Sequence, residues 1–278
     1  MYRSNRTKKK LQTGKAVYGM IHSLAHPLVA EMIGLAGYDF IVIDGEHGPG
    51  GMSGHLACLQ AVASTPATAI LRVAENDVTL IKRALDLGVE GLLIPDIGTE
   101  QEAAAAVAAC FYPPRGRRGF SAATVRASDY SLSLDKYLAG GGSELLVCLM
   151  IESANGVRNV RKIAAVDGVD VIQVGPFDLS YDLGIPGQFE HPKYLEAMDK
   201  IEAAVLGAGK ILGGVPLPGL SLETVLDRGY RFITLGADIP VLAKALTGIL
   251  DTPARKSRIR RSATQARHTA SKRGSKKT

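Results

Sequence analysis

The sequence predicts an α/β protein with a (β/α)8 barrel, the TIM-barrel architecture, and three observations indicate this fold. Between residues 15 and 250, short runs of β-branched and aliphatic residues alternate with longer stretches of helical period. The strand-like runs number eight, and a helical candidate follows each of them. The chain of 278 residues is long enough for a barrel of roughly 200 to 250 residues that closes around one core.

The predicted strands are short and strongly apolar. They cover residues 16–21, 39–44, 69–73, 91–95, 146–152, 169–175, 210–215 and 231–236. The predicted helices alternate with them, and glycine-containing breaks such as Leu87-Gly88 end several, as helix C-caps commonly do. These helices cover residues 27–35, 54–64, 77–87, 100–111, 157–165, 192–206, 221–227 and 239–250. An open α/β sheet built from the same units is the alternative fold.

The interval between the fourth and fifth predicted strands is unusually long. Residues 112–143 contain the turn-like run PPRGRRG and three consecutive glycines. We expect this interval to be a long loop that overhangs the catalytic face of the barrel, because functional loops of barrels gather there.

Charge divides the chain into an acidic body and two basic ends. Residues 1–15 carry six Lys or Arg and residues 252–278 carry ten, with no Asp or Glu in either, so the body has 17 cations against 27 anions. The C-terminal segment has almost no large apolar residues and cannot offset the entropy of ordering itself. We therefore expect a barrel domain over residues 1–251 and a disordered basic tail over residues 252–278. We expect this tail to be a solubilising extension, and weak polyanion binding or targeting is its alternative role.

Several functional classes are excluded. No apolar stretch reaches the roughly 18 residues of a membrane span, and no basic segment leads into a signal-peptide core. The three cysteines form no Cys-x-x-Cys pair, and the chain has neither a G-x-G-x-x-G motif after its first strand nor a P-loop. We expect a cytoplasmic protein with no membrane partner and no nucleic-acid partner.

Polar side chains follow four of the predicted strands, where barrel enzymes carry their catalytic groups. These residues are Asp44, Glu46, His47, Arg72, Glu152 and Asp178. Carboxylates on adjacent strands suit a hard divalent cation such as Mg²⁺ or Mn²⁺, although each of them alone often only caps a helix.

The remaining polar residues suit acid–base and electrostatic roles. His47 suits a general base, with a structural hydrogen bond as the alternative role. Asp44 favours the base, because a neighbouring carboxylate can fix the tautomer of the imidazole. Arg72 either pairs with these acids or serves as a fixed cation for a developing oxyanion. No lysine ends a predicted strand at the catalytic face, so Schiff-base chemistry is not expected.

At these residues the chain resembles the HpcH/HpaI aldolase family, the class II pyruvate aldolases that act on 4-hydroxy-2-oxo acids. The resemblance covers roughly residues 5–250, and the segments IDGEH and GPFDLS carry most of it. The resemblance implies a metal-dependent carbon–carbon lyase that cleaves a 4-hydroxy-2-oxo acid to pyruvate and an aldehyde through a metal-stabilised enolate. It also implies that the basic N-terminus forms the first helix of the domain.

The resemblance implies a role for each site residue. Glu152 and Asp178 would be the ligands of Mg²⁺, Mn²⁺ or Co²⁺, and Arg72 would stabilise the enolate oxygen. His47, oriented by Asp44 with Asp86 behind it, would exchange the proton of the C4 hydroxyl. The 2-oxo acid carboxylate would be held by the backbone of four consecutive residues: Gly175, Pro176, Phe177 and Asp178. Family members form hexamers with shared active sites, so a homo-oligomer is implied.

Two positions depart from the family pattern. Met150 stands where many relatives carry Gln, two residues before Glu152 and on the same face of the strand. Asp96 replaces a usually apolar residue after the fourth predicted strand. Both departures bear on the choice of substrate. A citrate-lyase-like lyase of acyl-CoA thioesters on the same fold and a non-catalytic scaffold with a polyanion-binding tail are the alternative functions.

Overall fold

The strands form a closed parallel barrel in the order β1 to β8. The computed structural model describes residues 3–121 and 123–250. The strands are β1 (Val17–His22), β2 (Phe40–Asp44), β3 (Thr68–Arg72), β4 (Gly91–Ile94), β5 (Leu146–Ile151), β6 (Val171–Val174), β7 (Ile211–Gly214) and β8 (Tyr230–Ala237). All eight predicted strands are confirmed, and pairing of β1 with β8 closes the sheet. The open-sheet alternative is therefore wrong.

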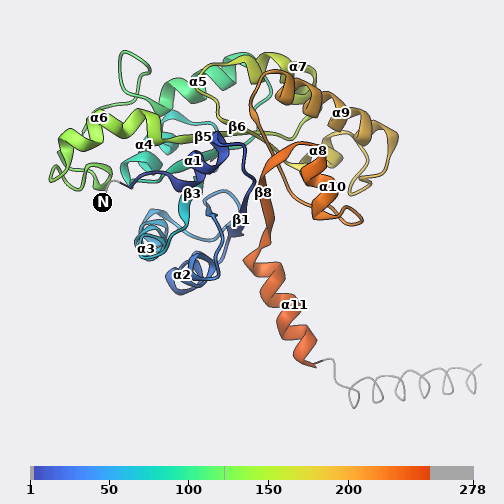
Figure 1. Cartoon of the computed structure of the whole chain (residues 1–278), viewed down its shortest axis with the longest axis horizontal. Coiled ribbons are helices and arrows are strands. Elements are labelled where there is room, and N and C mark those ends of the chain that lie inside the picture. The colour runs from blue at the N-terminus through green and yellow to red at the C-terminus, as the bar shows by residue number, and fades with distance from the viewer. Residues whose placement is uncertain (1–2, 122, 251–278) are drawn as a thin grey trace, which may run out of the picture. The chain divides into compact units, whose positions relative to one another are not determined.

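Helices lie around these strands (Figure 1). The helices of the barrel unit are α1 (Arg6–Gln12), α2 (Pro27–Leu35), α3 (Met52–Val62), α4 (Val78–Asp86), α5 (Glu100–Cys110), α6 (Leu134–Glu144), α7 (Ala154–Ala165), α8 (Pro176–Asp182), α9 (Pro192–Gly207) and α10 (Leu222–Asp227), with a short 3₁₀ helix at Arg126–Ser128. Capping side chains start many of them. Asp77, for example, accepts the backbone N–H groups of Thr79 and Leu80 at 2.8 and 2.9 Å at the start of α4.

The core has two layers because both faces of the barrel sheet are buried. Alternate residues such as Phe40, Met150 and Phe232 point inward, and the rings of Phe40 and Phe232 stack with centroids 4.0 Å apart. The other face packs against the helices. The expected first helix is confirmed as α1, and Leu11 of α1 belongs to the interior cluster of the barrel.

The long interval between β4 and β5 lies at the opposite end of the barrel from the one we expected. It follows α5, which runs antiparallel to the strands and returns the chain to their N-terminal ends. Arg126 there donates to the carbonyl oxygen of Leu87 at 2.7 Å, just before β4. The interval also contains α6, which was not predicted because its three glycines disfavour a helix. It therefore cannot overhang the catalytic face of its own barrel.

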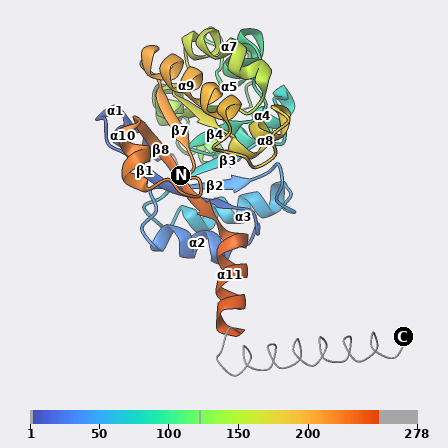
Figure 2. The same ribbon diagram turned by 90° about the vertical axis from the view of Figure 1, so that its right-hand side faces the viewer.

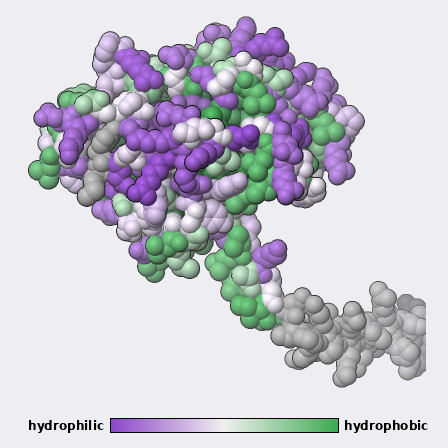
Figure 3. Space-filling view, viewed as in Figure 1, coloured by the Kyte–Doolittle hydropathy of each residue, from purple (hydrophilic) through white to green (hydrophobic). Residues whose placement is uncertain are grey.

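A second unit begins at Asp238 and contains α11 (Asp238–Leu250), which confirms the eighth predicted helix. Large apolar side chains are exposed along α11, and Figure 3 shows them gathered on this helix. They are Ile239, Val241, Leu242, Leu246, Ile249 and Leu250. The boundary predicted at residue 251 stays a prediction, and the predicted basic tail lies outside the described residues. Among the described helices, none is long and apolar enough to cross a bilayer.

Candidate active site

An ion pair joins the ends of β2 and β3. Asp44 and Arg72 are partners in the sheet register, so both side chains leave the C-terminal ends of their strands side by side. The Nε and Nη2 atoms of Arg72 lie 3.0 and 2.9 Å from Oδ1 of Asp44. Burial alone would raise the pKa of Asp44, but the charge of Arg72 and hydrogen bonds from Ser23 and His47 hold it below its ordinary value.

The loop after β2 is held by the same carboxylate. Oδ1 of Asp44 accepts the backbone N–H groups of Glu46 and His47, each at 3.2 Å. The imidazole of His47 is largely exposed, and its Nε2 lies 3.8 Å from Oε2 of Glu46. Within the described chain, no hydrogen bond joins the imidazole to Asp44. Asp44 therefore orients His47 through the backbone, and the predicted contact with the ring is not present.

Two further side chains, Glu46 and Ser23, belong to this network. The sequence marked Glu46 as a polar residue at the end of its strand but indicated no role for Ser23. Ser23, just after β1, donates from its hydroxyl to Oδ2 of Asp44 at 2.8 Å. Glu46 places Oε2 at 3.0 Å from Nη1 of Arg72, so the guanidinium is held between two carboxylates. Burial raises the pKa of Glu46, and the negative charges of Asp44 and Asp178 add to this effect against the opposing charge of Arg72. IDGEH was the available signal for Glu46, whereas Ser23 lies in an unremarkable turn.

Glu152 follows β5 and is buried at the same end of the barrel. Its Oε1 accepts the backbone N–H of Asp96 at 2.7 Å, and Asp96 has a left-handed backbone conformation with φ of 50°. Burial, with the negative charges of Glu46 and Asp178, raises the pKa of Glu152 to about 7. Glu152 is thus a desolvated carboxylate among other acids, an arrangement that a divalent cation would stabilise.

Asp178 reaches this cluster from the first turn of α8. Gly175 links β6 to α8, and a Cβ atom added there would lie 2.4 Å from Oε2 of Glu152. Only glycine allows the backbone to approach this carboxylate so closely. Pro176 is buried, and the ring of Phe177 packs edge-on against Phe189 with centroids 5.4 Å apart. The segment therefore presents its backbone at the site, and the Phe177 ring is directed to Phe189.

The residues present fit a divalent cation. Glu152 and Asp178 offer oxygen donors of the kind that Mg²⁺ and Mn²⁺ prefer, and the glycine at 175 keeps space beside Oε2 of Glu152. No group of three or more Asp, Glu, His or Cys side chains in residues 3–121 and 123–250 is arranged as a complete metal site. Two carboxylates would leave the other coordination positions to water and substrate.

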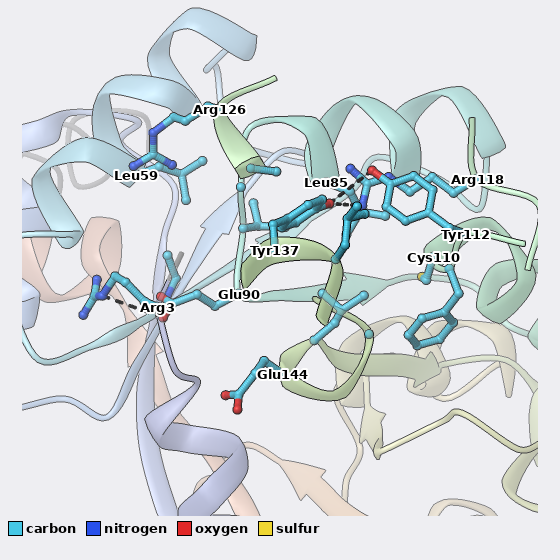
Figure 4. A pocket seen from close by; sticks show the side chains of 18 of the residues that line it. Arg3, Leu59, Leu85, Glu90, Cys110, Tyr112, Arg118, Arg126, Tyr137 and Glu144 are labelled. Atoms are coloured by element: carbon cyan, nitrogen blue, oxygen red, sulfur yellow. Dashed lines mark hydrogen bonds and ion pairs between the residues drawn. The ribbon is translucent and has the colours of Figure 1, made fainter. Parts of the chain in front are cut away.

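Asp86 lies apart from these residues within one chain. It is the last residue of α4, a helix that starts near the end of β3 and returns to the N-terminal end of the barrel. Its Oδ1 accepts from Nη2 of Arg118 at 2.7 Å, and Nη1 of Arg118 donates to the hydroxyl of Tyr137 at 2.9 Å. Figure 4 shows Arg118 between Tyr112 and Tyr137 in a pocket at this end. Asp86 therefore cannot lie behind His47 of the same chain.

Sequence comparison assigns the chain to a family. The sequence profile of the HpcH/HpaI aldolase/citrate lyase family matches residues 18–245, which include every site residue described here. The chain belongs to this family. The HpcH/HpaI resemblance inferred from IDGEH and GPFDLS is thus confirmed.

Named relatives and a solved structure agree with this assignment. The chain is 35% identical to a hydroxypyruvate/pyruvate aldolase of Cupriavidus necator over 87% of this chain and 90% of that one. It is 36% identical to a 4-hydroxy-2-oxo-heptane-1,7-dioate aldolase of Salmonella dublin over 86% and 91%. The crystal structure of an HpcH/HpaI family protein from Burkholderia cenocepacia superposes with a TM-score of 0.84 at 35% identity, covering 89% of this chain and 98% of that one.

Proposed function

We propose that this HpcH/HpaI protein is a class II pyruvate aldolase, which cleaves a 4-hydroxy-2-oxo acid to pyruvate and an aldehyde. The observation that carries the proposal is the cluster at the C-terminal ends of β2, β3 and β5, where Arg72 lies between Asp44 and Glu46 and near the buried Glu152. Cleavage of this bond requires a base for one hydroxyl and an electron sink for one carbonyl. The cluster and the adjacent His47 offer both.

Glu152 and Asp178 are the proposed ligands of a divalent cation, Mg²⁺, Mn²⁺ or Co²⁺. When bound, such a cation polarises the keto group of the substrate as a Lewis acid. Both residues leave the barrel at the C-terminal face, one after β5 and one from the first turn of α8. A cation would also offset the mutual repulsion that raises the pKa of Glu152.

The chain's own groups carry the remaining steps. His47 accepts the proton of the C4 hydroxyl as the C3–C4 bond breaks and the aldehyde forms. The electron pair of that bond forms the C2–C3 double bond of the enolate, and the π pair of the carbonyl moves to the keto oxygen, where the guanidinium of Arg72 stabilises the negative charge. Protonation of C3 then gives pyruvate. Arg72 is pre-oriented for this role because two carboxylates already hold it. The backbone of residues 175–178 holds the substrate carboxylate at the start of α8, through the N–H groups of Phe177 and Asp178. Pro176 has no N–H, and the N–H of Gly175 donates to the carbonyl oxygen of Ile151 at 3.1 Å.

A homo-oligomer, with the hexamer implied by the resemblance, is the proposed assembly. The apolar side chains exposed on α11 support it, because large contiguous apolar surfaces of soluble proteins mark interfaces. The predicted role of Asp86 at His47 also requires a second copy, since the two residues lie at opposite ends of one barrel. We therefore propose that Asp86 acts in the site of another subunit.

The decisive experiment follows exchange of the pyruvate methyl protons in D₂O by NMR, with metal-free enzyme and after addition of Mg²⁺ or Mn²⁺. This enolisation is the half-reaction that every aldehyde substrate shares. Metal-dependent exchange that is lost in Arg72→Ala and in Glu152→Ala supports the proposal. Absence of exchange with any of these metals, in protein shown to be folded by circular dichroism, contradicts it.

A further inference from the structure

Gln173 lies in the barrel interior directly below the proposed site. It belongs to β6, where its Cα pairs with Met150 of β5 and with Gly213 of β7. Met150 belongs to the interior cluster of the barrel. Two positions further along the chain, Glu152 follows Met150 and Gly175 follows Gln173. Side chains two apart on a strand share a face, so Gln173 lies one layer beneath Glu152 and Gly175.

The Oε1 atom of the Gln173 carboxamide is buried without a partner. Gln173 is 4% exposed, and no hydrogen bond joins its carboxamide to any residue that the structure describes. Buried amides are nearly always hydrogen-bonded, because an unpaired polar group loses its hydration without compensation. Its neighbours in the barrel interior are apolar and include Met150, Val171 and Phe232. An apolar residue at position 173 would therefore fit the interior better than glutamine.

The barrel nevertheless makes room for this side chain. A Cβ atom at Gly213 would lie 2.4 Å from Oε1 of Gln173, so glycine at this position is what admits the carboxamide. Oε1 faces Gly213, and the planar group directs Nε2 away from it. Met150 extends its thioether toward the layer of Glu152 and Gly175, since its Cε would lie 3.1 Å from a Cβ added at Gly175. Met150 cannot donate a hydrogen bond, which leaves Gln173 as the amide donor beneath Glu152 and Gly175.

We propose that Gln173 contacts the substrate, its Nε2 donating a hydrogen bond to an oxygen atom of the bound 2-oxo acid. This inference rests on the proposed aldolase function and extends it to a residue whose partner is supplied only when substrate binds. Polar groups that a fold leaves unsatisfied at a functional site commonly cost stability and serve recognition. Gln173 thus contributes from β6 the polar contact that Met150 on β5 does not provide.

The test is the substitution Gln173→Met, which keeps nearly the same volume and removes the carboxamide. Three measurements are made on the full chain. Pyruvate methyl exchange in D₂O and the Kd of oxalate, by calorimetry, are measured with Mg²⁺, and thermal unfolding is measured on the metal-free protein. We expect the Kd of oxalate and the KM of pyruvate exchange to rise roughly tenfold or more. We expect Tm to rise, because the unpaired amide is gone. A purely structural glutamine would not give these opposite changes.

Two further variants complete the design. Leu146→Met is the matched control, since it exchanges an interior residue for methionine at the far end of β5. The double variant Met150→Gln with Gln173→Met returns an amide to the adjacent position in register, and we expect it to recover part of the lost affinity. Unchanged oxalate binding and unchanged exchange in Gln173→Met would overturn the inference while leaving the aldolase proposal intact. Absence of metal-dependent exchange in the unmodified protein would overturn both.

Discussion

Arg72 and Asp44 leave neighbouring strands in register and form a fork in which two guanidinium nitrogens share Oδ1 of the carboxylate, at 3.0 and 2.9 Å. The third nitrogen, Nη1, pairs with Glu46 at 3.0 Å. The guanidinium of Arg72 is therefore held in one orientation before substrate binds. The other oxygen of Asp44, Oδ2, accepts the hydrogen bond from the hydroxyl of Ser23. Electrostatic stabilisation of a developing oxyanion is effective when its donors need no reorganisation.

Loss of this fixation reduces enolisation. In Asp44→Asn the uncharged amide no longer holds the guanidinium by charge, and we expect the pyruvate exchange rate to fall roughly 10²-fold or more. Arg72→Lys should be at least as impaired, because one ammonium group cannot span both Asp44 and Glu46 as the planar guanidinium does. Exchange rates at saturating Mg²⁺ measure both effects. Wild-type rates in Arg72→Lys would show that the charge alone suffices.

His47 is expected to act on the hydroxyl of the aldol and not on the methyl group of pyruvate. In His47→Asn we therefore expect cleavage of a 4-hydroxy-2-oxo acid to fall roughly 10² to 10⁴-fold, with pyruvate exchange much less affected. Coupled detection of pyruvate measures the first rate, and NMR in D₂O measures the second. Because the His47 ring is exposed, Tm should not change. Equal losses of both rates would assign His47 to enolisation instead.

The raised pKa of Glu152 predicts a pH-dependent stability of the metal-free protein. The carboxyl of Glu152 binds its proton more tightly in the folded state than in the unfolded chain. The contribution of this proton to the free energy of unfolding is therefore complete below about pH 4.5 and is lost as the pH rises through about 7. Glu152→Gln removes this penalty and should stabilise the metal-free protein by roughly 1 to 3 kcal/mol near pH 8, with little effect near pH 4. Added Mg²⁺ should raise Tm of the wild type near pH 8 but not that of Glu152→Gln. Urea unfolding at pH 4 and pH 8 measures the stability of both proteins. Equal free energies of unfolding of the wild type and Glu152→Gln at both pH values would contradict this account.

The barrel was predictable because the sequence alternates clearly between short apolar strands and stretches of helical period. Each strand is a short apolar run buried on both faces, and each helix follows it with a recognisable cap or glycine break, as at Asp77 and Gly88. Three features were missed: helix α8, helix α6 and the place of the interval after β4. Helix α6 contains three glycines, which mask its helical character, and the place of the interval after β4 depends on the direction of α5. A chain that passes through a helix returns to the other end of the barrel, so this interval lies opposite the catalytic face.

The site was predictable in part. The ends of parallel strands gather at one face, which brings Asp44, Arg72 and Glu152 together. The pairing of Arg72 with Glu46 and the bond from Ser23 to Asp44 depend on side-chain directions in loops, which follow no period. The predicted position of Asp86 came from the resemblance alone, and the direction of α4 excludes it within one subunit.

Exposed apolar residues on α11 predict an interface. Leu242 and Leu246 are four residues apart on one face of the helix, and both are about half exposed. In the double variant Leu242→Glu and Leu246→Glu we expect the assembly to dissociate to smaller species, because two charges would be buried at the contact. Light scattering after size-exclusion chromatography measures the mass. Leu132→Glu is the control, since Leu132 is 89% exposed in the interval before α6. An unchanged mass in the α11 variant would exclude this face as a subunit contact.

Complementation between two inactive subunits tests whether Asp86 serves the site of another copy. Asp86→Asn retains an oxygen acceptor for Arg118 and so should fold, but it removes the charge proposed to act on His47. Arg72→Ala lacks the enolate stabiliser yet keeps Asp86. When both chains are co-expressed with different tags and the mixed oligomer is isolated, roughly a quarter of the sites combine an intact Arg72 with an intact Asp86 from a neighbour. We expect aldol cleavage to recover in proportion, whereas each variant alone is nearly inactive. If the mixed oligomer stays as inactive as its parents, Asp86 serves no neighbouring site, and its pairing with Arg118 is structural.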